Sequence, residues 1–98
     1  MAKKGYWVSA YRSIKDPDKL AAYAKLAGPA FAKYGAKYLV RDTAAQAYEA
    51  GMKQRIVIVE FESVAKAVEA HDSADYQAAL KVLAGAAERD LRIVEGLE

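Results

Sequence analysis

The carboxylate of Glu60 stands out because it belongs to the most β-rich stretch of the chain. Residues 54–61 read Gln-Arg-Ile-Val-Ile-Val-Glu-Phe, a run typical of a strand buried on both faces. A carboxylate in apolar surroundings can act as a general base or can anchor a polar ligand. The alternative is a structural carboxylate paired with an arginine, Arg41 or Arg55, within one chain or across a dimer. The residues alone leave both interpretations open.

His71 is the second candidate catalytic residue. It is the only histidine and precedes Asp72, where we predict a break between two helices. An imidazole beside a carboxylate can shuttle protons near neutral pH. The alternative is a surface turn in which Asp72 and Ser73 begin the next helix. We expect no metal site and no cofactor, because the chain has no cysteine and no second histidine.

Arginines and tyrosines supply the candidate ligand-binding groups. Arg41 and Arg55 can hold a carboxylate-bearing ligand through paired hydrogen bonds, although they can also serve Glu60 or a dimer rim. Aromatic side chains with polar tips suit a pocket for a small cyclic or apolar compound. Of the seven tyrosines, Tyr11 and Tyr76 are our candidates for ligand contact. We expect the others to pack in the core or at an interface.

The composition fits one folded domain over residues 1–98. The hydrophobic fraction of 54% argues against disorder, and 98 residues make a core that dimerisation often supplements. The net charge is +2 without a basic stripe, so we expect no nucleic-acid partner. No apolar run approaches the roughly 20 residues that span a bilayer, and residues 1–4 lack a signal-peptide core. We therefore expect no membrane partner and a cytoplasmic location.

The elements that must position these groups follow from periodicity, helix caps and turn residues. We predict a strand over 5–14, a helix from Asp16-Pro17 to Gly35, a strand over 37–41, an irregular hairpin over 42–53, a strand over 54–61, a helix over 63–70, a second helix from Ser73 to Ala87 and a strand over 91–96. The order is βαββαβ, with the second helix in two pieces, which is the ferredoxin-like α+β fold with a four-stranded antiparallel sheet.

Both helices of this fold cover the same face of the sheet, and the other face stays bare. Strand 5–14 presents small residues such as Val8 and Ala10 on one face and aromatic residues on the other. We expect the helices on the small face and a bare face that carries Trp7, Tyr11, Ile56 and Ile58. Such an apolar patch is too large for a soluble monomer. We therefore predict a homodimer that pairs the open sheet faces as a dimeric α/β barrel.

Four blocks of the sequence resemble the domain-of-unknown-function 1330 family of the dimeric α/β-barrel superfamily. They are Gly5-Tyr6-Trp7-Val8, Ile58-Val59-Glu60-Phe61-Glu62-Ser63, Asp72-Ser73-Ala74-Asp75-Tyr76-Gln77 and Ile93-Val94-Glu95-Gly96. The resemblance implies the same fold and a dimer, but the family name assigns no activity. The wider superfamily includes cofactor-free monooxygenases, muconolactone isomerases and haem enzymes, which is an analogy at the level of fold.

These observations predict a pocket between the helices and the sheet of each subunit. We expect Glu60 inside it and Arg41, His71 and Tyr76 near its mouth. The leading hypothesis is binding of a small organic molecule, with cofactor-independent proton-transfer or monooxygenase-type chemistry at Glu60 or His71. The alternative is a non-catalytic dimeric module in which Glu60 completes an ion pair.

Overall fold

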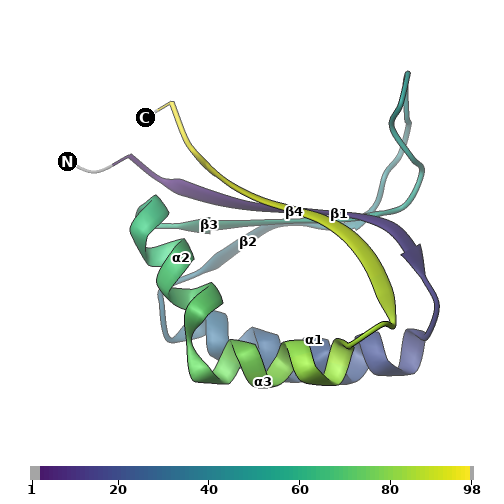
Figure 1. The fold of residues 1–98 in the computed structure, drawn as a ribbon. Coiled ribbons are helices and arrows are strands. Elements are labelled where there is room, and N and C mark those ends of the chain that lie inside the picture. Colours follow the sequence, from purple (N-terminus) through teal and green to yellow (C-terminus); the bar gives the residue numbers. More distant parts are fainter. Residues whose placement is uncertain (1–2, 98) are drawn as a thin grey trace.

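Residues 3–97, as described by a computed structural model, form a sheet with helices on one face only (Figure 1). The elements are β1 (Gly5–Ile14), α1 (Pro17–Ala32), β2 (Lys37–Thr43), β3 (Arg55–Phe61), α2 (Val64–Asp72), α3 (Ala74–Leu83) and β4 (Ala87–Glu95). The four strands lie in the order β2-β3-β1-β4, and every neighbouring pair is antiparallel. The predicted ferredoxin-like βαββαβ fold is confirmed.

Short polar side chains begin each helix as the sequence indicates. Asp16 accepts hydrogen bonds from the amides of Asp18 and Lys19, and Pro17 takes the first helical position of α1. Ser63 caps α2, and Ser73 both ends α2 and caps α3. The division of the second helical region at residues 71–73 therefore follows from two serine caps.

Trp7 lies at the centre of the core, on the helix-covered face of the sheet. Its ring centroid is 4.8 Å from that of Phe31 and 5.0 Å from that of Tyr76. The prediction that the helices cover the small face of β1 is therefore wrong. The helices are rich in buried alanines, such as Ala27 and Ala70, so the room for large rings lies against the helices.

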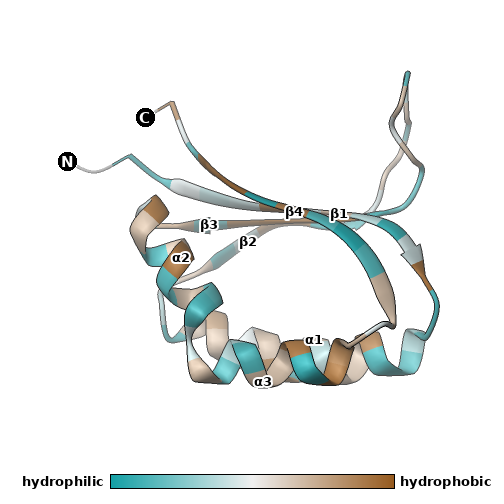
Figure 2. Ribbon diagram, viewed as in Figure 1, coloured by the Kyte–Doolittle hydropathy of each residue, from teal (hydrophilic) through white to brown (hydrophobic). Residues whose placement is uncertain are grey.

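The opposite face carries Tyr6, Val8 and Ala10 of β1, and the register pairs Val8 with Ile58 and Ala10 with Ile56. Ile56 and Ile58 lie on this open face as expected, whereas Trp7 and Tyr11 do not. No helix covers this face in the part of the chain that the structure describes (Figure 1). Figure 2 shows apolar residues along β3 and β4 at the level of the sheet.

Residues 44–54 form an irregular arm between β2 and β3. The amide of Ala44 donates to the carbonyl of Gln54 at 2.9 Å, and the amide of Gly51 donates to the carbonyl of Tyr48 at 2.8 Å. The arm projects from the sheet on the side away from the helices (Figure 1). This agrees with the irregular hairpin predicted for 42–53, except that Asp42 and Thr43 extend β2.

Within residues 3–97, every helix is too short or too polar to cross a lipid bilayer.

Candidate functional site

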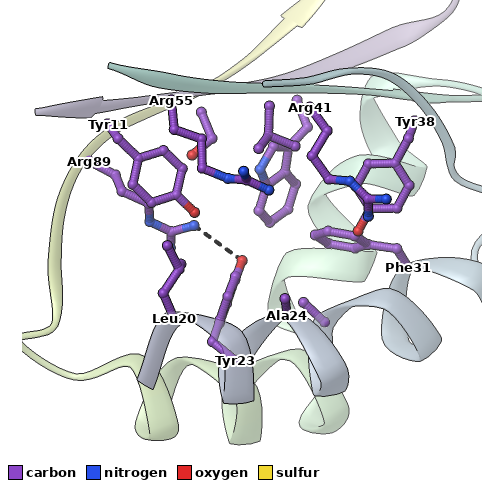
Figure 3. A pocket seen from close by; sticks show the side chains of 13 residues that line it. Tyr11, Leu20, Tyr23, Ala24, Phe31, Tyr38, Arg41, Arg55 and Arg89 are labelled. Carbon is purple, nitrogen blue, oxygen red and sulfur yellow. Dashed lines mark hydrogen bonds between the residues drawn. The ribbon is translucent and has the colours of Figure 1, made fainter. Parts of the chain in front are cut away.

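A cavity of about 220 Å³ lies between the sheet and α1 (Figure 3). Aromatic and small apolar side chains form most of its wall, and arginines supply its charge. The lining residues are Trp7, Ser9, Tyr11, Leu20, Tyr23, Ala24, Ala27, Phe31, Tyr38, Arg41, Arg55, Val57 and Arg89. A concave, mostly apolar site with a few convergent polar groups is the usual form of a small-molecule pocket.

The cavity exists because short side chains face each other across it. Ser9 and Val57 are neighbours on β1 and β3, and both lie on the helix-covered face. Ala24 and Ala27 of α1 line the same space from the opposite side. Neither pair is long enough to fill the space between the sheet and the helix, so a hollow remains among the larger side chains.

A β-bulge brings two residues of β2 into the cavity. The pairing of β2 with β3 shifts between Tyr38 and Val40, which inserts one extra residue. Tyr38 and Arg41 therefore both line the cavity although they are three residues apart. The guanidinium of Arg41 lies 4.9 Å from the centroid of the Tyr38 ring.

Three of the predicted ligand-binding residues, Tyr11, Arg41 and Arg55, line this cavity. In Figure 3 the guanidinium of Arg55 points from β3 into the space above Tyr23. Tyr76 is fully buried beside the cavity and does not line it. The role of Tyr11, Arg41 and Arg55 in ligand binding stays a prediction, and their shared position on the wall of one cavity gives that ligand a place.

Arg89 is held by a pair of buried tyrosines. Its guanidinium donates to the hydroxyl of Tyr23 at 3.1 Å and to that of Tyr76 at 3.4 Å, and the two hydroxyls lie 2.7 Å apart. Burial disfavours the charge of Arg89, but the interactions with Tyr23 and Tyr76 outweigh it and raise the pKa of Arg89. Burial, with a further contribution from Tyr76, raises the pKa of Tyr23 far above its ordinary value.

The raised pKa of Tyr23 predicts a loss of stability in alkali. A group whose pKa is raised in the folded state contributes stability below its unfolded pKa and loses it as the pH rises. We therefore expect the free energy of unfolding to fall above about pH 10, the ordinary tyrosine pKa. Urea unfolding between pH 7 and 11 measures it, with a shallower fall expected for Tyr23→Phe than for the exposed control Tyr48→Phe. Equal slopes in these two variants would contradict the assignment.

Glu60 does not lie in the cavity. It pairs with Tyr6 in the β1–β3 register, faces the open side of the sheet and accepts a hydrogen bond from the Tyr6 hydroxyl at 3.2 Å. The prediction that places Glu60 between the helices and the sheet is wrong. Successive side chains of a strand point to opposite faces of the sheet, so Glu60 points away from the core that its neighbours Val59 and Phe61 enter. Within residues 3–97, Glu60 forms no ion pair with Arg41 or Arg55, because both arginines lie on the helix-covered face of the sheet.

His71 lies at the C-terminal end of α2 and does not line the cavity. Its Nδ1 is 2.9 Å from a carboxylate oxygen of Asp72, and its ring centroid is 5.7 Å from that of Trp7. The predicted place near the mouth of the pocket is therefore wrong. Among residues 3–97, no three His, Cys, Asp or Glu side chains are grouped to hold a metal ion.

The sequence reasoning missed Arg89, Ser9 and the cavity role of Trp7. The last strand begins at Ala87, four residues before the predicted start at Leu91. Had the alternation of Leu91 and Ile93 been followed back by one step, Arg89 would have been placed on the same face. No signal in the sequence marked Ser9, because a serine in a strand is common on either face.

Comparison with known proteins gives a family and a fold. A family model described as "Domain of unknown function (DUF1330)" matches residues 4–97. A search of curated proteins found no match. Among solved structures, the chain is similar to the RPA0582 protein of unknown function from Rhodopseudomonas palustris, with 22% identity and a TM-score of 0.72 over 100% of this chain and 85% of that chain.

Two further solved structures share the fold at lower identity. One is a dimeric ferredoxin-like protein of unknown function from Thermobifida fusca, 13% identical with a TM-score of 0.63, covering 98% of this chain and 93% of that chain. The other is SnoaB, a cofactor-independent oxygenase from Streptomyces nogalater, 9% identical with a TM-score of 0.63, covering 99% and 96%. At these identities the likeness concerns the fold alone.

Proposed function

The chain belongs to the DUF1330 family, whose description assigns no activity, and we propose from the cavity that it binds a small organic molecule between the sheet and α1. The observation that carries the proposal is the cavity itself. It is an apolar hollow of about 220 Å³, with the side chains of Arg41, Arg55 and Arg89 on its wall. An apolar space of roughly 150 Å³ can hold a benzene molecule, so one ring with a polar substituent fits the available volume.

The lining supports binding rather than acid–base catalysis in this cavity. It contains no carboxylate and no imidazole, so Glu60 and His71 are not in reach of a molecule bound there. Burial raises the pKa of Tyr23 and of Tyr38, which keeps both phenols protonated at neutral pH. Proton-transfer or monooxygenase-type chemistry at Glu60 or His71 would therefore need a substrate outside this cavity. For the cavity itself we propose ligand binding as the function.

A change that fills the cavity tests the proposal. Benzoate and benzamide serve as charged and uncharged single-ring probes, and NMR amide shifts report where each binds. We expect at least one of them to shift signals of the cavity residues. Ala24→Leu adds bulk to the lining and is expected to weaken that binding by about tenfold.

Ala21→Leu provides the matched control, because Ala21 lies on the same helix, is exposed and does not line the cavity. Unchanged binding is expected for this variant. If neither benzoate nor benzamide shifts the cavity signals at millimolar concentration, the proposed function is wrong.

We also propose a homodimer through the open face of the sheet. This face carries Val8, Ile56 and Ile58 at its centre, and it carries Val40 and Val94 at 41% and 53% exposure toward its edges. Its apolar patch is bordered by charged groups on the same face, which are Glu60, Asp90 and Arg92. An apolar patch that no helix covers within residues 3–97 is the kind of surface a two-fold dimer can bury. The similar protein from Thermobifida fusca is described as dimeric, which supports the proposal.

In such a dimer Glu60 lies at the interface rather than in the ligand cavity. Its hydrogen bond with Tyr6 fixes the carboxylate on the open face. A buried carboxylate needs hydrogen-bond partners or a cation, and a second subunit can provide them. A carboxylate bonded in this way would have a structural role at the interface, which is the alternative to a catalytic role for Glu60.

A further inference from the structure

We infer that the ligand of the cavity is a small aromatic carboxylate, with its acid group bound by Arg55 and its ring against α1. The inference rests on the proposed function and specifies the chemical class that the cavity selects. Its basis is the charge of the lining, an unpartnered hydroxyl and the apolar space between them.

The charge of the lining is positive without compensation. Arg41, Arg55 and Arg89 surround one cavity whose lining contains no acidic residue. Within residues 3–97, the cations of the ion pairs are Lys33, Lys66, His71 and Arg92. The lining is therefore net positive, and this charge favours a bound anion over a neutral molecule of the same shape.

Arg55 is the arginine best placed to bind an anion inside the cavity. Within residues 3–97 neither Arg41 nor Arg55 donates a hydrogen bond, whereas Arg89 is bonded to two buried tyrosines. Arg41, however, is exposed and lies over the ring of Tyr38. Arg55 is half-buried and points into the cavity (Figure 3). A guanidinium has five N–H donors in a planar fork that matches the two oxygens of a carboxylate.

Ser9 adds a polar group that has no hydrogen-bond partner within residues 3–97. Its side chain is 1% exposed, lines the cavity, and its hydroxyl makes no hydrogen bond within the described residues. A buried unsatisfied hydroxyl is costly, so such groups mark places where another molecule completes the bonding. Ser9 on β1 pairs with Val57 on β3, and Arg55 is two residues before Val57 on the same face of β3. The Ser9 hydroxyl can therefore bond an oxygen of the same ligand that Arg55 holds.

The rest of the wall selects a flat ring. Trp7, Tyr23 and Phe31 supply aromatic surface, while Ala24 and Ala27 leave the space that a ring needs. Inorganic phosphate shares the anionic chemistry but cannot use this apolar surface. The geometry therefore points to a carboxylate attached to a single aromatic ring.

Calorimetric titration of the whole protein at pH 7.5 with benzoate, benzamide and inorganic phosphate tests the inference. Benzamide has the shape of benzoate without the charge. We expect benzoate to bind about tenfold more tightly than benzamide, the effect of a charge-assisted hydrogen bond, and more tightly than phosphate. Arg55→Gln should remove the preference for benzoate, whereas Arg12→Gln, an exposed arginine outside this cavity, should retain it.

The outcomes separate this inference from the proposed function. Benzamide binding as tightly as benzoate would leave a small-molecule site and overturn the carboxylate assignment. Phosphate binding as tightly as benzoate would overturn the role of the ring. If none of the three compounds binds, both the inference and the proposed function are wrong. These comparisons use the unaltered protein, so they do not depend on the folding of a variant.

Discussion

Replacing Gly5 with alanine is expected to destabilise the protein by about 3 kcal/mol, the upper part of the range for overpacked sites. A Cβ atom at Gly5 would lie 2.5 Å from the carbonyl oxygen of Ser63 and 2.6 Å from the amide nitrogen of Val64. These are backbone atoms at the start of α2, so no side-chain rotation relieves the contact. Either β1 or α2 must shift, and both pack against the core.

Urea unfolding at pH 7 measures this effect, and Gly28→Ala is the matched control. Gly28 lies inside α1, and a Cβ atom there would have no neighbour within 4 Å apart from the adjacent residues and the helix backbone. Alanine is a better helix former than glycine, but the ring of Pro29 crowds a Cβ atom on the residue before it, so this variant should change the free energy of unfolding by less than about 1 kcal/mol. The same substitution thus has very different effects at the two sites. A Gly5→Ala variant as stable as the unaltered protein would show that the start of α2 does not crowd Gly5.

A lysine at Ile58 is expected to convert the proposed dimer into a monomer. Ile58 faces the open side of the sheet, opposite Val8 on the neighbouring strand. In a two-fold dimer the substitution places a lysine from each subunit in the same apolar interface. Burying an unpaired ammonium group costs several kcal/mol, and the repulsion between two of them adds to that cost.

Light scattering at micromolar concentration measures the mass of each variant. Leu26→Lys is the control, because Leu26 lies on α1 and is already 43% exposed. We expect this variant to have the mass of the unaltered dimer. A monomer mass for the unaltered protein would refute the dimer. A dimer mass for the Ile58→Lys variant would show that the subunits associate through a surface other than the open face of the sheet.

The order of the elements was readable from the sequence because it depends on local signals. Asp16-Pro17, Ser63 and Ser73 each begin a helix through bonds to amides two or three residues ahead. The strand over 55–61 follows from its β-branched run. These interactions lie within a few residues, so their signals are present in any short window of the chain.

The site depends on which face of the sheet the helices cover, and no local signal decides that. The alternation of β1 separates Trp7 and Tyr11 from Val8 and Ala10, but it does not say which set is inside. The answer lies in the alanines of α1, α2 and α3, which leave room for large rings. The position of Glu60 was wrongly predicted for the same reason. Glu60 is on the same face as Tyr6, with which it pairs, and the open side of the sheet is that face.

The cavity itself was further out of reach of sequence reasoning. It needs Ser9 and Val57 to lie opposite Ala24 and Ala27, and it needs a bulge in β2 to turn Arg41 inward. These are coincidences of position between segments far apart in the chain. The arginines were recognised as candidates by their chemistry, but their shared location is a property of the assembled sheet.

The position of Trp7 makes the molecule its own optical probe. Trp7 is the only tryptophan of the chain, it is 1% exposed, and it lines the cavity. Its emission therefore comes from one known environment, shielded from water by the core on one side and bordering the ligand space on the other. Fluorescence can follow both unfolding and the entry of a ligand in the same sample, without a label and without altering a single residue.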